Sequence, residues 1–163
     1  MTVQAPGYTP RPFINLHEQE GENMKKDDCI FCKIANGEIP SNTICEDDEF
    51  RVILDNGPAT KGHALVLPKE HYADLFEIPE DLAGRALGMA KKAGEKIRAA
   101  LSADGLNIVQ NNGECAGQTV SHFHIHVIPR YRNDGQLIGW KPGSPSAEEL
   151  AEVRKAVNGE ADA

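Results

Sequence analysis

The stretch Gly117-Gln-Thr-Val-Ser-His-Phe-His-Ile-His-Val-Ile-Pro-Arg-Tyr131 places three histidines at every second position of the chain. Aromatic and β-branched residues fill the positions between and after them, and this alternation is typical of a strand with one buried face. We therefore expect His122, His124 and His126 on one side of a sheet, about 7 Å apart along the strand. A single histidine in a strand is usually structural, but a row of three indicates a site that meets a phosphate or a metal.

The segments around this row predict an antiparallel sheet. Residues 105–110 have the composition of a strand, and the polar loop 111–117 is too short for a crossover, so this strand should pair antiparallel with the histidine strand. A further loop delivers His63 to the head of another strand. Three earlier segments are also expected to be strands: 43–46, 50–55 and 64–67.

The longest predicted helix covers residues 79–101, where apolar side chains recur at helical spacing with lysines and arginines opposite them. A short helix is expected over 28–37, with Asp27 or Asp28 as its cap and Asn36-Gly37 as its stop. Helices and antiparallel strands come in blocks along the chain. The fold class is therefore α+β, with an antiparallel sheet of about five strands, one long helix and short flanking helices.

The two ends of the chain differ from its middle. Residues 1–24 contain prolines, glycines and a glutamate-rich run without periodicity, which predicts a flexible N-terminal arm. Residues 25–143 are expected to form the folded domain. Residues 144–163 are expected to form an amphipathic helix and a tail, because Ser146-x-x-Glu149 is a capping-box pattern that opens a helix to about Val157.

The composition limits the functions that this chain can have. Its 163 residues suit one domain, and the net charge of −8 argues against a surface that binds long nucleic acid, although a local pocket can still hold one phosphate. No apolar run is long enough to cross a bilayer, so we expect no membrane partner. No N-terminal stretch resembles a signal peptide, and a cytoplasmic protein is expected.

Two kinds of site can be built from the histidine row. Three imidazoles and a water can hold a catalytic metal, or one neutral imidazole can attack phosphorus while its neighbours hold the phosphate oxygens. The pair Gln118-Thr119 favours the second site, because its amide and hydroxyl groups suit phosphate oxygens and a leaving group. Glu114 is the only carboxylate between Asp104 and Asp134, which gives little support to a metallohydrolase.

His122-Phe-His-Ile-His-Val-Ile128 resembles the signature of the HIT (histidine triad) superfamily. The resemblance extends from Cys29 to about Arg130. Within the superfamily, the chain is most similar to the bacterial members of the Hint branch, which are nucleoside phosphoramidases and related nucleotide hydrolases. Further matching motifs occur in the family's order: Cys29-Ile-Phe-Cys-Lys-Ile34, Gly37-Glu-Ile-Pro40, Glu46-Asp-Asp48, Gly62-His-Ala-Leu-Val-Leu-Pro-Lys69, Asn111-Asn-Gly113 and Gly117-Gln-Thr-Val120.

This resemblance implies a HIT-like fold and a role for particular residues. His124 would attack the α-phosphate of a nucleoside phosphoramidate or a dinucleoside polyphosphate and carry the AMP or GMP moiety for a time. His126 and His63 would polarise the phosphate and orient the nucleophile. The remaining implied contacts are Gln118 and Thr119 with phosphate oxygens or the leaving group, Asn111 with the same pocket, and Asp55 with the ribose hydroxyls.

The resemblance also implies a slot for the base, formed by Phe31, Ile34, Ile53 and Leu54. An alternative interpretation is that Phe31, Ile34 and Ile53 are simply core residues, and the usual burial of these residue types favours it. In the family a serine is commoner at the position of Thr119, which keeps the hydroxyl group and adds a methyl group.

Cys29-x-x-Cys32 indicates a metal half-site or a redox pair. A redox pair normally opens a helix straight after a strand in a βαβ unit, and this pair does not. The pair resembles the half-site of bacterial HIT proteins and galactose-phosphate uridylyltransferases, whose partners correspond here to His71 and His122. The resemblance therefore implies a structural zinc ion with four protein ligands and no role in the chemistry.

Two other functions remain open at this point: a nucleotide-binding regulatory protein with little turnover, and a metallohydrolase that uses the histidine row as zinc ligands. A homodimer is expected from the resemblance. Trp140 and Pro142 resemble the tails of family members that reach the active site of the neighbouring subunit.

Overall fold

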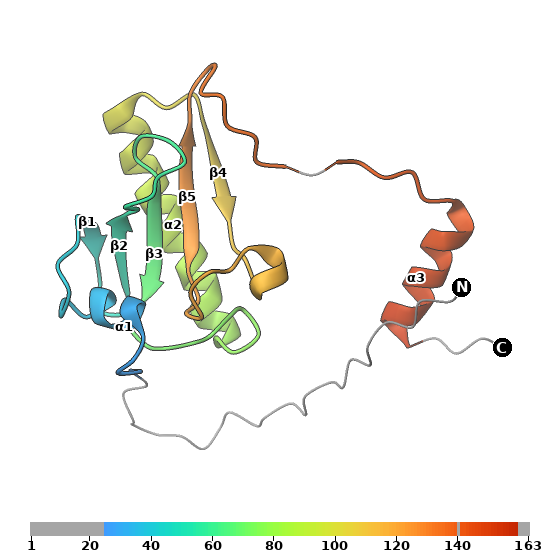
Figure 1. Ribbon diagram of the computed structural model, residues 1–163, viewed down its shortest axis with the longest axis horizontal. Helices are drawn as coiled ribbons and strands as arrows, with labels where there is room; N and C mark the ends of the chain where they lie inside the picture. Colours follow the sequence, from blue (N-terminus) through green and yellow to red (C-terminus); the bar gives the residue numbers. More distant parts are fainter. Residues whose placement is uncertain (1–24, 140, 160–163) are drawn as a thin grey trace. The chain divides into compact units, whose positions relative to one another are not determined.

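The computed structural model describes residues 25–139 and 141–159 (Figure 1). The chain divides between Arg132 and Asn133 into two compact units. The predicted flexible arm, 1–24, and Trp140 lie outside the described residues. In the part of the chain that is described, no helix is both long and apolar enough to span a bilayer.

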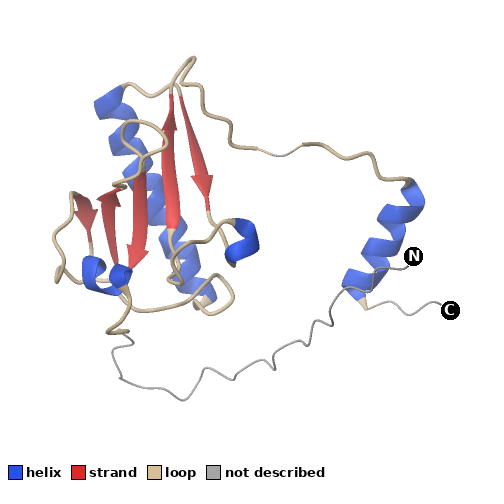
Figure 2. Cartoon of the chain, viewed as in Figure 1, coloured by secondary structure: helices blue, strands red, loops and turns tan. Residues whose placement is uncertain are grey.

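The first unit is built on an antiparallel sheet in the order β1-β2-β3-β5-β4 (Figure 2). This five-stranded arrangement with its helices confirms the α+β prediction, and β4 pairs antiparallel with β5 as expected. The strands are β1 (Thr43–Glu46), β2 (Phe50–Leu54), β3 (Ala64–Pro68), β4 (Gly105–Val109) and β5 (Ile125–Arg130).

One face of the sheet packs against α2 (Glu80–Leu101), which lies behind the strands in Figure 1. The apolar side chains predicted at helical spacing do face the sheet, and Pro79 occupies the N-cap position. Phe50, Val66 and Val127 are fully buried in this core, and each such side chain stabilises the fold by about 1.5–3 kcal/mol. This layer fixes the sheet from one side.

The opposite face packs against the short helix α1 (Ile30–Ala35), whose Ala35 contacts a cluster that contains Ile53, Leu65 and Leu67. The prediction of Asp27 or Asp28 as the cap of this helix was wrong. Cys29 occupies the N-cap position in an extended conformation and makes no side-chain cap hydrogen bond, because its sulfur lies 3.5 Å from His122 Nδ1. The functional residues described below lie on this side of the sheet.

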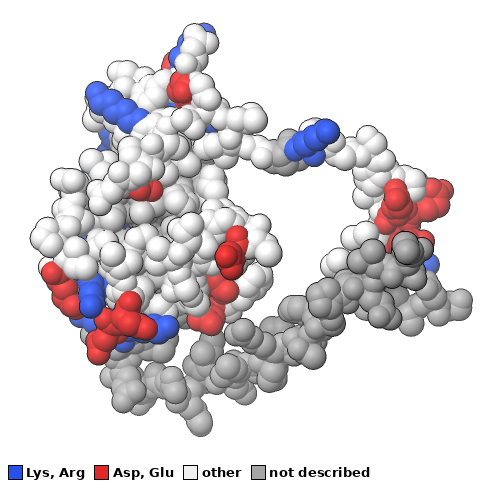
Figure 3. Space-filling model, viewed as in Figure 1, with Lys and Arg blue, Asp and Glu red and all other residues white. Residues whose placement is uncertain are grey.

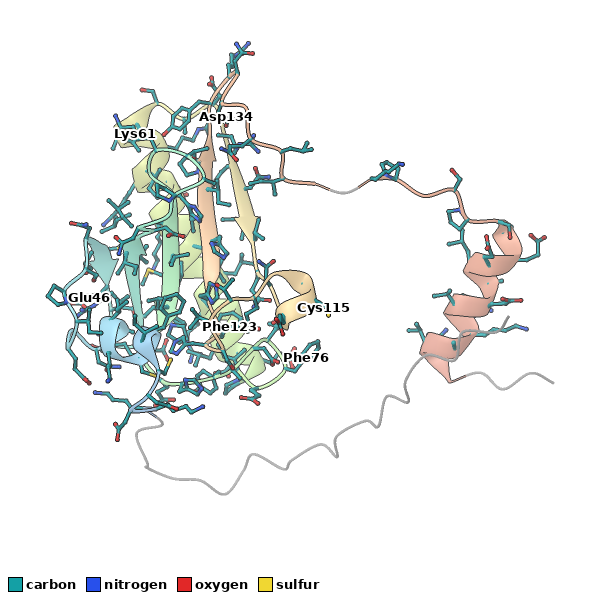
Figure 4. All side chains as sticks on the ribbon, in the orientation of Figure 1. Glu46, Lys61, Phe76, Cys115, Phe123 and Asp134 are labelled. Atoms are coloured by element: carbon teal, nitrogen blue, oxygen red, sulfur yellow. The ribbon has the colours of Figure 1, made fainter. Side chains whose placement is uncertain are left out.

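The sequence predicted that the whole histidine row lies in a strand, but only part of it does. β5 begins only at Ile125, and the Phe123 N–H donates to the Tyr72 carbonyl, 2.6 Å away, instead of to a neighbouring strand. Phe123, labelled in Figure 4, lies two residues before β5. The alternation of sides still holds, because Phe123, Ile125 and Val127 enter the α2 core.

The second unit contains α3 (Ala147–Asn158). The predicted capping box is confirmed, since the Glu149 N–H donates to Ser146 Oγ and the Ser146 N–H donates to the Glu149 carboxylate. Leu150, Val153 and Val157 lie along this helix with exposed side chains.

Candidate active site and metal cluster

The histidine row is divided between two clusters of possible metal ligands. The cysteine–histidine cluster consists of Cys29, Cys32, His71 and His122, and the aspartate–histidine cluster consists of Asp55, His63 and His126. Within each cluster, the ligand atoms lie within 4.8 Å of one another. His124 belongs to neither set, although its ring packs edge-on against the ring of His126 with 4.9 Å between centroids. The row therefore does not form a single three-histidine metal site.

The cysteine–histidine cluster has the spacing of a tetrahedral metal site. His122 Nδ1 lies 3.5 Å from the sulfur of Cys29 and 3.5 Å from that of Cys32, and His71 Nδ1 lies 3.4 Å from the Cys32 sulfur. A tetrahedral zinc ion with its usual bond lengths separates sulfur from nitrogen by about 3.5 Å. The four predicted ligands are thus brought together at a distance that fits such an ion.

A main-chain contact prepares His122 to bind a metal. The His122 Nε2–H donates to the Pro68 carbonyl at 3.0 Å, so the lone pair of the neutral ring is on Nδ1, the atom that faces the cysteines. Metal-binding histidines usually make this kind of contact through their second nitrogen. Burial lowers the pKa of His122 to about 4, and burial raises the pKa of Cys32 to about 11. Metal binding must therefore displace the proton of this thiol.

His124 is a buried histidine with one nitrogen engaged. Its Nδ1–H donates to the main-chain carbonyl of His122 at 2.7 Å, and this tautomer leaves the lone pair on Nε2. Burial is the main cause of a lowered pKa at His124, partly offset by the contact with the His122 carbonyl and by the charge of Asp55. The ring is therefore neutral at physiological pH, which is the form that attacks an electrophile.

In the aspartate–histidine cluster the hydrogen bonds run in one direction. The Ala59 N–H donates to His63 Nδ1 at 3.0 Å, so the proton of the neutral His63 ring is on Nε2. The His63 Nε2–H donates to His126 Nδ1 at 2.9 Å. Because His126 Nδ1 accepts, the proton of the neutral His126 ring is on His126 Nε2. Asp55 Oδ2 lies 3.6 Å from His63 Nε2. Burial, with the neighbouring rings of His124 and His63, lowers the pKa of His126 to about 4.

The loop between β2 and β3 holds this cluster in place. The Asp55 N–H donates to the His63 carbonyl at 2.9 Å, and the Gly57 N–H donates to Asp55 Oδ1 at 2.8 Å. Gly62 adopts a φ of +90°, and a Cβ atom at this position would lie 2.5 Å from Leu101 Cδ1. Only glycine fits both demands, and the tight turn it allows sets His63 at the head of β3.

The three polar residues predicted to contact phosphate lie in the loop that precedes β5. The Gln118 amide donates to the carbonyls of Ala73 (2.7 Å) and Val120 (3.0 Å), and its oxygen accepts from the Gly113 N–H at 2.8 Å. Thr119 is exposed, and Asn111 lies beside Gly117. In this arrangement Gln118 ties the loop to the segment that carries His71, and its contact with phosphate remains a prediction.

The residues predicted to form the base slot lie around α1 and β2. The Phe31 ring meets that of His124 edge-on, with centroids 5.1 Å apart, so this residue borders the His124 ring. Ile53 is buried, Ile34 packs partly buried beside it, and Leu54 is exposed. Ile53 is a core residue, and Phe31 and Ile34 pack partly buried against its cluster, while Phe31 also contacts the His124 ring. The contributions of Ala59 and Pro68 could not be predicted from the residue types, because each acts through a main-chain group.

A protein-family model and several known proteins match the sequence of this chain. The family model described as "HIT domain" matches residues 36–133. An uncharacterized HIT-like protein of Methanocaldococcus jannaschii is 46% identical over 131 residues, which cover 80% of this chain and 99% of that protein. An enzyme named adenosine 5'-monophosphoramidase from Saccharomyces cerevisiae is 38% identical, and the match covers 78% of each chain.

A solved structure is also similar to this chain. It is that of a zinc-bound histidine triad family protein from Mycobacterium smegmatis, which is 36% identical and superposes with a TM-score of 0.64. The match covers 79% of this chain and 97% of that one.

Proposed function

This chain belongs to the HIT family, and on that premise we propose that it is a nucleotidyl hydrolase or transferase that works through a covalent nucleotidyl-histidine at His124. The proposed substrates are nucleoside phosphoramidates or dinucleoside polyphosphates with an AMP or GMP moiety. A relative that is named for adenosine 5'-monophosphoramidase activity supports this class of substrate.

The observation that carries the proposal is the hydrogen bond from His124 Nδ1 to the His122 carbonyl. A neutral imidazole is nucleophilic only at the nitrogen without a proton, and this contact leaves that nitrogen at Nε2. The burial of His124 keeps the ring neutral, so the nucleophile needs no separate base at neutral pH. The ring of Phe31 on one side and that of His126 on the other limit its rotation.

The reaction then has two steps. In the first, His124 Nε2 attacks the α-phosphorus, the bond from phosphorus to the leaving nitrogen or oxygen breaks, and the leaving group takes up a proton. In the second, water attacks the same phosphorus, the bond to Nε2 breaks, and nucleoside monophosphate leaves with the ring of His124 restored. An acceptor other than water in the second step would make the reaction a transfer.

His126 is the proposed hydrogen-bond donor to the phosphate or the leaving group. Its Nδ1 accepts from His63, so its Nε2 carries the proton and has no hydrogen-bond partner among the described residues. His63 keeps this tautomer in place because its own Nδ1 accepts from the Ala59 N–H.

We assign the ribose contact to Asp55 and the border of the base slot to Phe31, with Ile34, Ile53 and Leu54 beneath or beside it. Gln118, Thr119 and Asn111 are the proposed contacts of phosphate and leaving group.

For the cysteine–histidine cluster we propose a structural zinc ion. Its two thiolates and two imidazoles complete a tetrahedral set with no position left for water, so the ion supplies only the binding energy that holds these ligands together. The ligands come from α1, from the segment after β3 and from the segment before β5, so the ion would fasten α1 to the sheet. None of the four cysteines is in a disulfide bond, which supports the proposal of a cytoplasmic protein.

We propose a homodimer that forms along β4, which is an edge strand of the sheet. Leu106 and Ile108 on this strand and Leu87 on α2 are large apolar side chains with substantial exposure, and edge strands with such neighbours favour pairing with a second copy. The variant Ile108→Lys should therefore shift the chain toward monomer in light scattering. Leu137→Lys, at an exposed leucine of the second unit, serves as the matched control. A wild-type monomer at all accessible concentrations would contradict this proposal.

The test of the mechanism is to trap the intermediate. Wild-type protein mixed with a radiolabelled AMP phosphoramidate and quenched within milliseconds should retain label on one histidine, located by mass spectrometry at position 124. His124→Ala should lose this label and at least about a thousandfold in turnover, as expected for loss of a nucleophile. Leu137→Ala is the control for handling. Hydrolysis by His124→Ala at the wild-type rate would reject the mechanism, and binding without label or turnover would favour a regulatory role.

A further inference from the structure

The aspartate–histidine cluster has the spacing of a second metal site. His63 Nε2 lies 2.9 Å from His126 Nδ1 and 3.6 Å from Asp55 Oδ2. In a tetrahedral zinc site with nitrogen and oxygen ligands, two such atoms are separated by about 3.3 Å. The two observed distances lie on either side of this value, and all three ligand atoms lie within 4.8 Å of one another, so side-chain shifts would bring them around one ion.

The chemistry of the three groups also suits a divalent transition metal. Two imidazoles and one carboxylate are ligands that zinc and its neighbours accept. The hydrogen bonds of His63 and His126 describe neutral rings, and the neutral ring is the form that binds a metal. Asp55 and His126 are only partly buried, whereas the ligands at Cys29, Cys32 and His122 are buried. A fourth position at the aspartate–histidine cluster is therefore accessible to water.

One hydrogen bond opposes the metal. A metal on His63 Nε2 requires the ring proton to move from Nε2 to Nδ1, where the Ala59 N–H now donates. Two donors then face each other, and the Ala59 amide loses its acceptor. His122 has the opposite arrangement, since its second nitrogen already donates to the Pro68 carbonyl. Metal binding at the aspartate–histidine cluster must accordingly be weaker than at the cysteine–histidine cluster.

From this geometry we propose that Asp55, His63 and His126 form a second, weaker site for Zn²⁺ and similar ions, and that an ion bound there competes with the nucleotide. The competition rests on the proposed function, in which Asp55 contacts the ribose and His126 Nε2–H contacts the phosphate. The metal would occupy the Asp55 carboxylate and the nitrogens through which His63 and His126 are joined. Zinc in excess of one equivalent therefore inhibits the enzyme, while the first equivalent does not.

The site can be tested by calorimetric titration of the full chain with Zn²⁺ from two starting states, the metal-free chain and the chain loaded with one equivalent. We expect a further equivalent to bind with lower affinity in the wild type. His126→Ala and Asp55→Asn should each lose this second event and keep the first. His71→Asn is the matched opposite, because it should weaken the first event and leave the second. The circular dichroism spectra of the variants report whether each is folded, and Asp55→Asn retains the shape of the side chain if His126→Ala does not fold.

Competition has its own measurement, which needs no turnover. AMP at ten times its own dissociation constant should weaken the second zinc event by about tenfold, as for any two ligands of one site. Substitution of Co²⁺ should give a thiolate-to-metal charge-transfer band for the first equivalent only. The metal site is refuted if the wild type takes up a single equivalent, or if the second event survives in both His126→Ala and Asp55→Asn. AMP without effect on a confirmed second event would refute the competition, and failure of the covalent mechanism would leave the metal site standing.

Discussion

The two clusters use the same residue type for opposite purposes. In the cysteine–histidine cluster, the second nitrogen of His122 donates to a carbonyl, which leaves a lone pair toward two sulfurs. In the aspartate–histidine cluster, the second nitrogen of His63 accepts from an amide, which leaves a proton toward His126. The main-chain group behind each ring thus decides which ring nitrogen has a lone pair available to a metal and which has a proton to donate. Residue type alone does not distinguish the two.

Solvent access differs between the clusters in the same sense. The ligands at Cys29, Cys32 and His122 are buried, whereas two of the three members of the other cluster are partly exposed. In Figure 3 the middle of the visible face of the domain carries few charged side chains. A closed set of ligands suits structure, and an open set suits a site through which substrate passes.

Of the changes that separate the two clusters, the loss of His126, the proposed hydrogen-bond donor of the aspartate–histidine cluster, should have the largest effect on turnover. His126→Ala should lower turnover by about 10²–10⁴, the usual range for loss of a residue that handles a proton. The variant should still bind one equivalent of zinc, because His126 has no part in the other cluster. Steady-state kinetics and metal analysis on the same sample check both statements. A loss of zinc together with activity would mean that the clusters are not independent.

Removal of the metal from the cysteine–histidine cluster should chiefly lower stability. At a free zinc concentration a thousandfold above the dissociation constant, binding adds about 4 kcal/mol to the free energy of unfolding. Cys32→Ser should lose most of this, and thermal denaturation with and without a chelator measures it. In the variant the chelator should cause little further change. An equal shift in both proteins would place the stabilising metal elsewhere.

Ala59→Pro tests the direction of the hydrogen bonds, because proline has no N–H to donate to His63 Nδ1. We expect about a fivefold loss of turnover, equivalent to about 1 kcal/mol for one hydrogen bond. The same change should tighten zinc binding at the aspartate–histidine cluster, since the proton of His63 can then move to Nδ1. Ala59→Gly retains the N–H and is the matched control. Tighter zinc binding in both variants would argue against the role of the amide.

The smallest effect concerns acid. The folded-state pKa of His126 is about 4, below its ordinary value, so the neutral ring persists as pH falls from 7 to 5 and is lost near pH 4. The contribution of His126 to kcat/KM should therefore stay nearly constant to pH 5 and halve near pH 4. Protonation would put a hydrogen on Nδ1, where His63 Nε2–H now donates. Metal content measured at each pH separates this limb from loss of zinc, and a midpoint near pH 6.5 would contradict the burial of the ring.

Sequence reasoning predicted best where a periodic pattern sets the local structure. The long helix was predicted within one residue of its observed start, because its apolar side chains recur at helical spacing. The start of β5 was predicted too early, because the amide of Phe123 pairs with Tyr72, a partner that is distant in the sequence. The prediction of the α1 cap was wrong for a related reason, since Cys29 belongs to the cysteine–histidine cluster and contacts His122.

The site was partly predictable in the same way. The resemblance named the members of both clusters, and the structure brings each set together. The tautomers were not predictable, because they depend on the Pro68 carbonyl, which any residue would offer, and on the Ala59 amide, which any residue except proline would offer. The partners of Gln118 were also missed, as they are carbonyl groups of Ala73 and Val120.

The contact between Cys29 and His122 joins residues 93 positions apart, and this has a consequence for how the protein is made. A loop of that length closes at an entropic cost, and α1 and the segment ahead of β5 must both be in place before the contact can offset it. On the ribosome, the first two thiols emerge long before their histidine partner. The newborn chain thus passes through a period in which Cys29 and Cys32 are open to oxidation, and prompt completion of synthesis protects them.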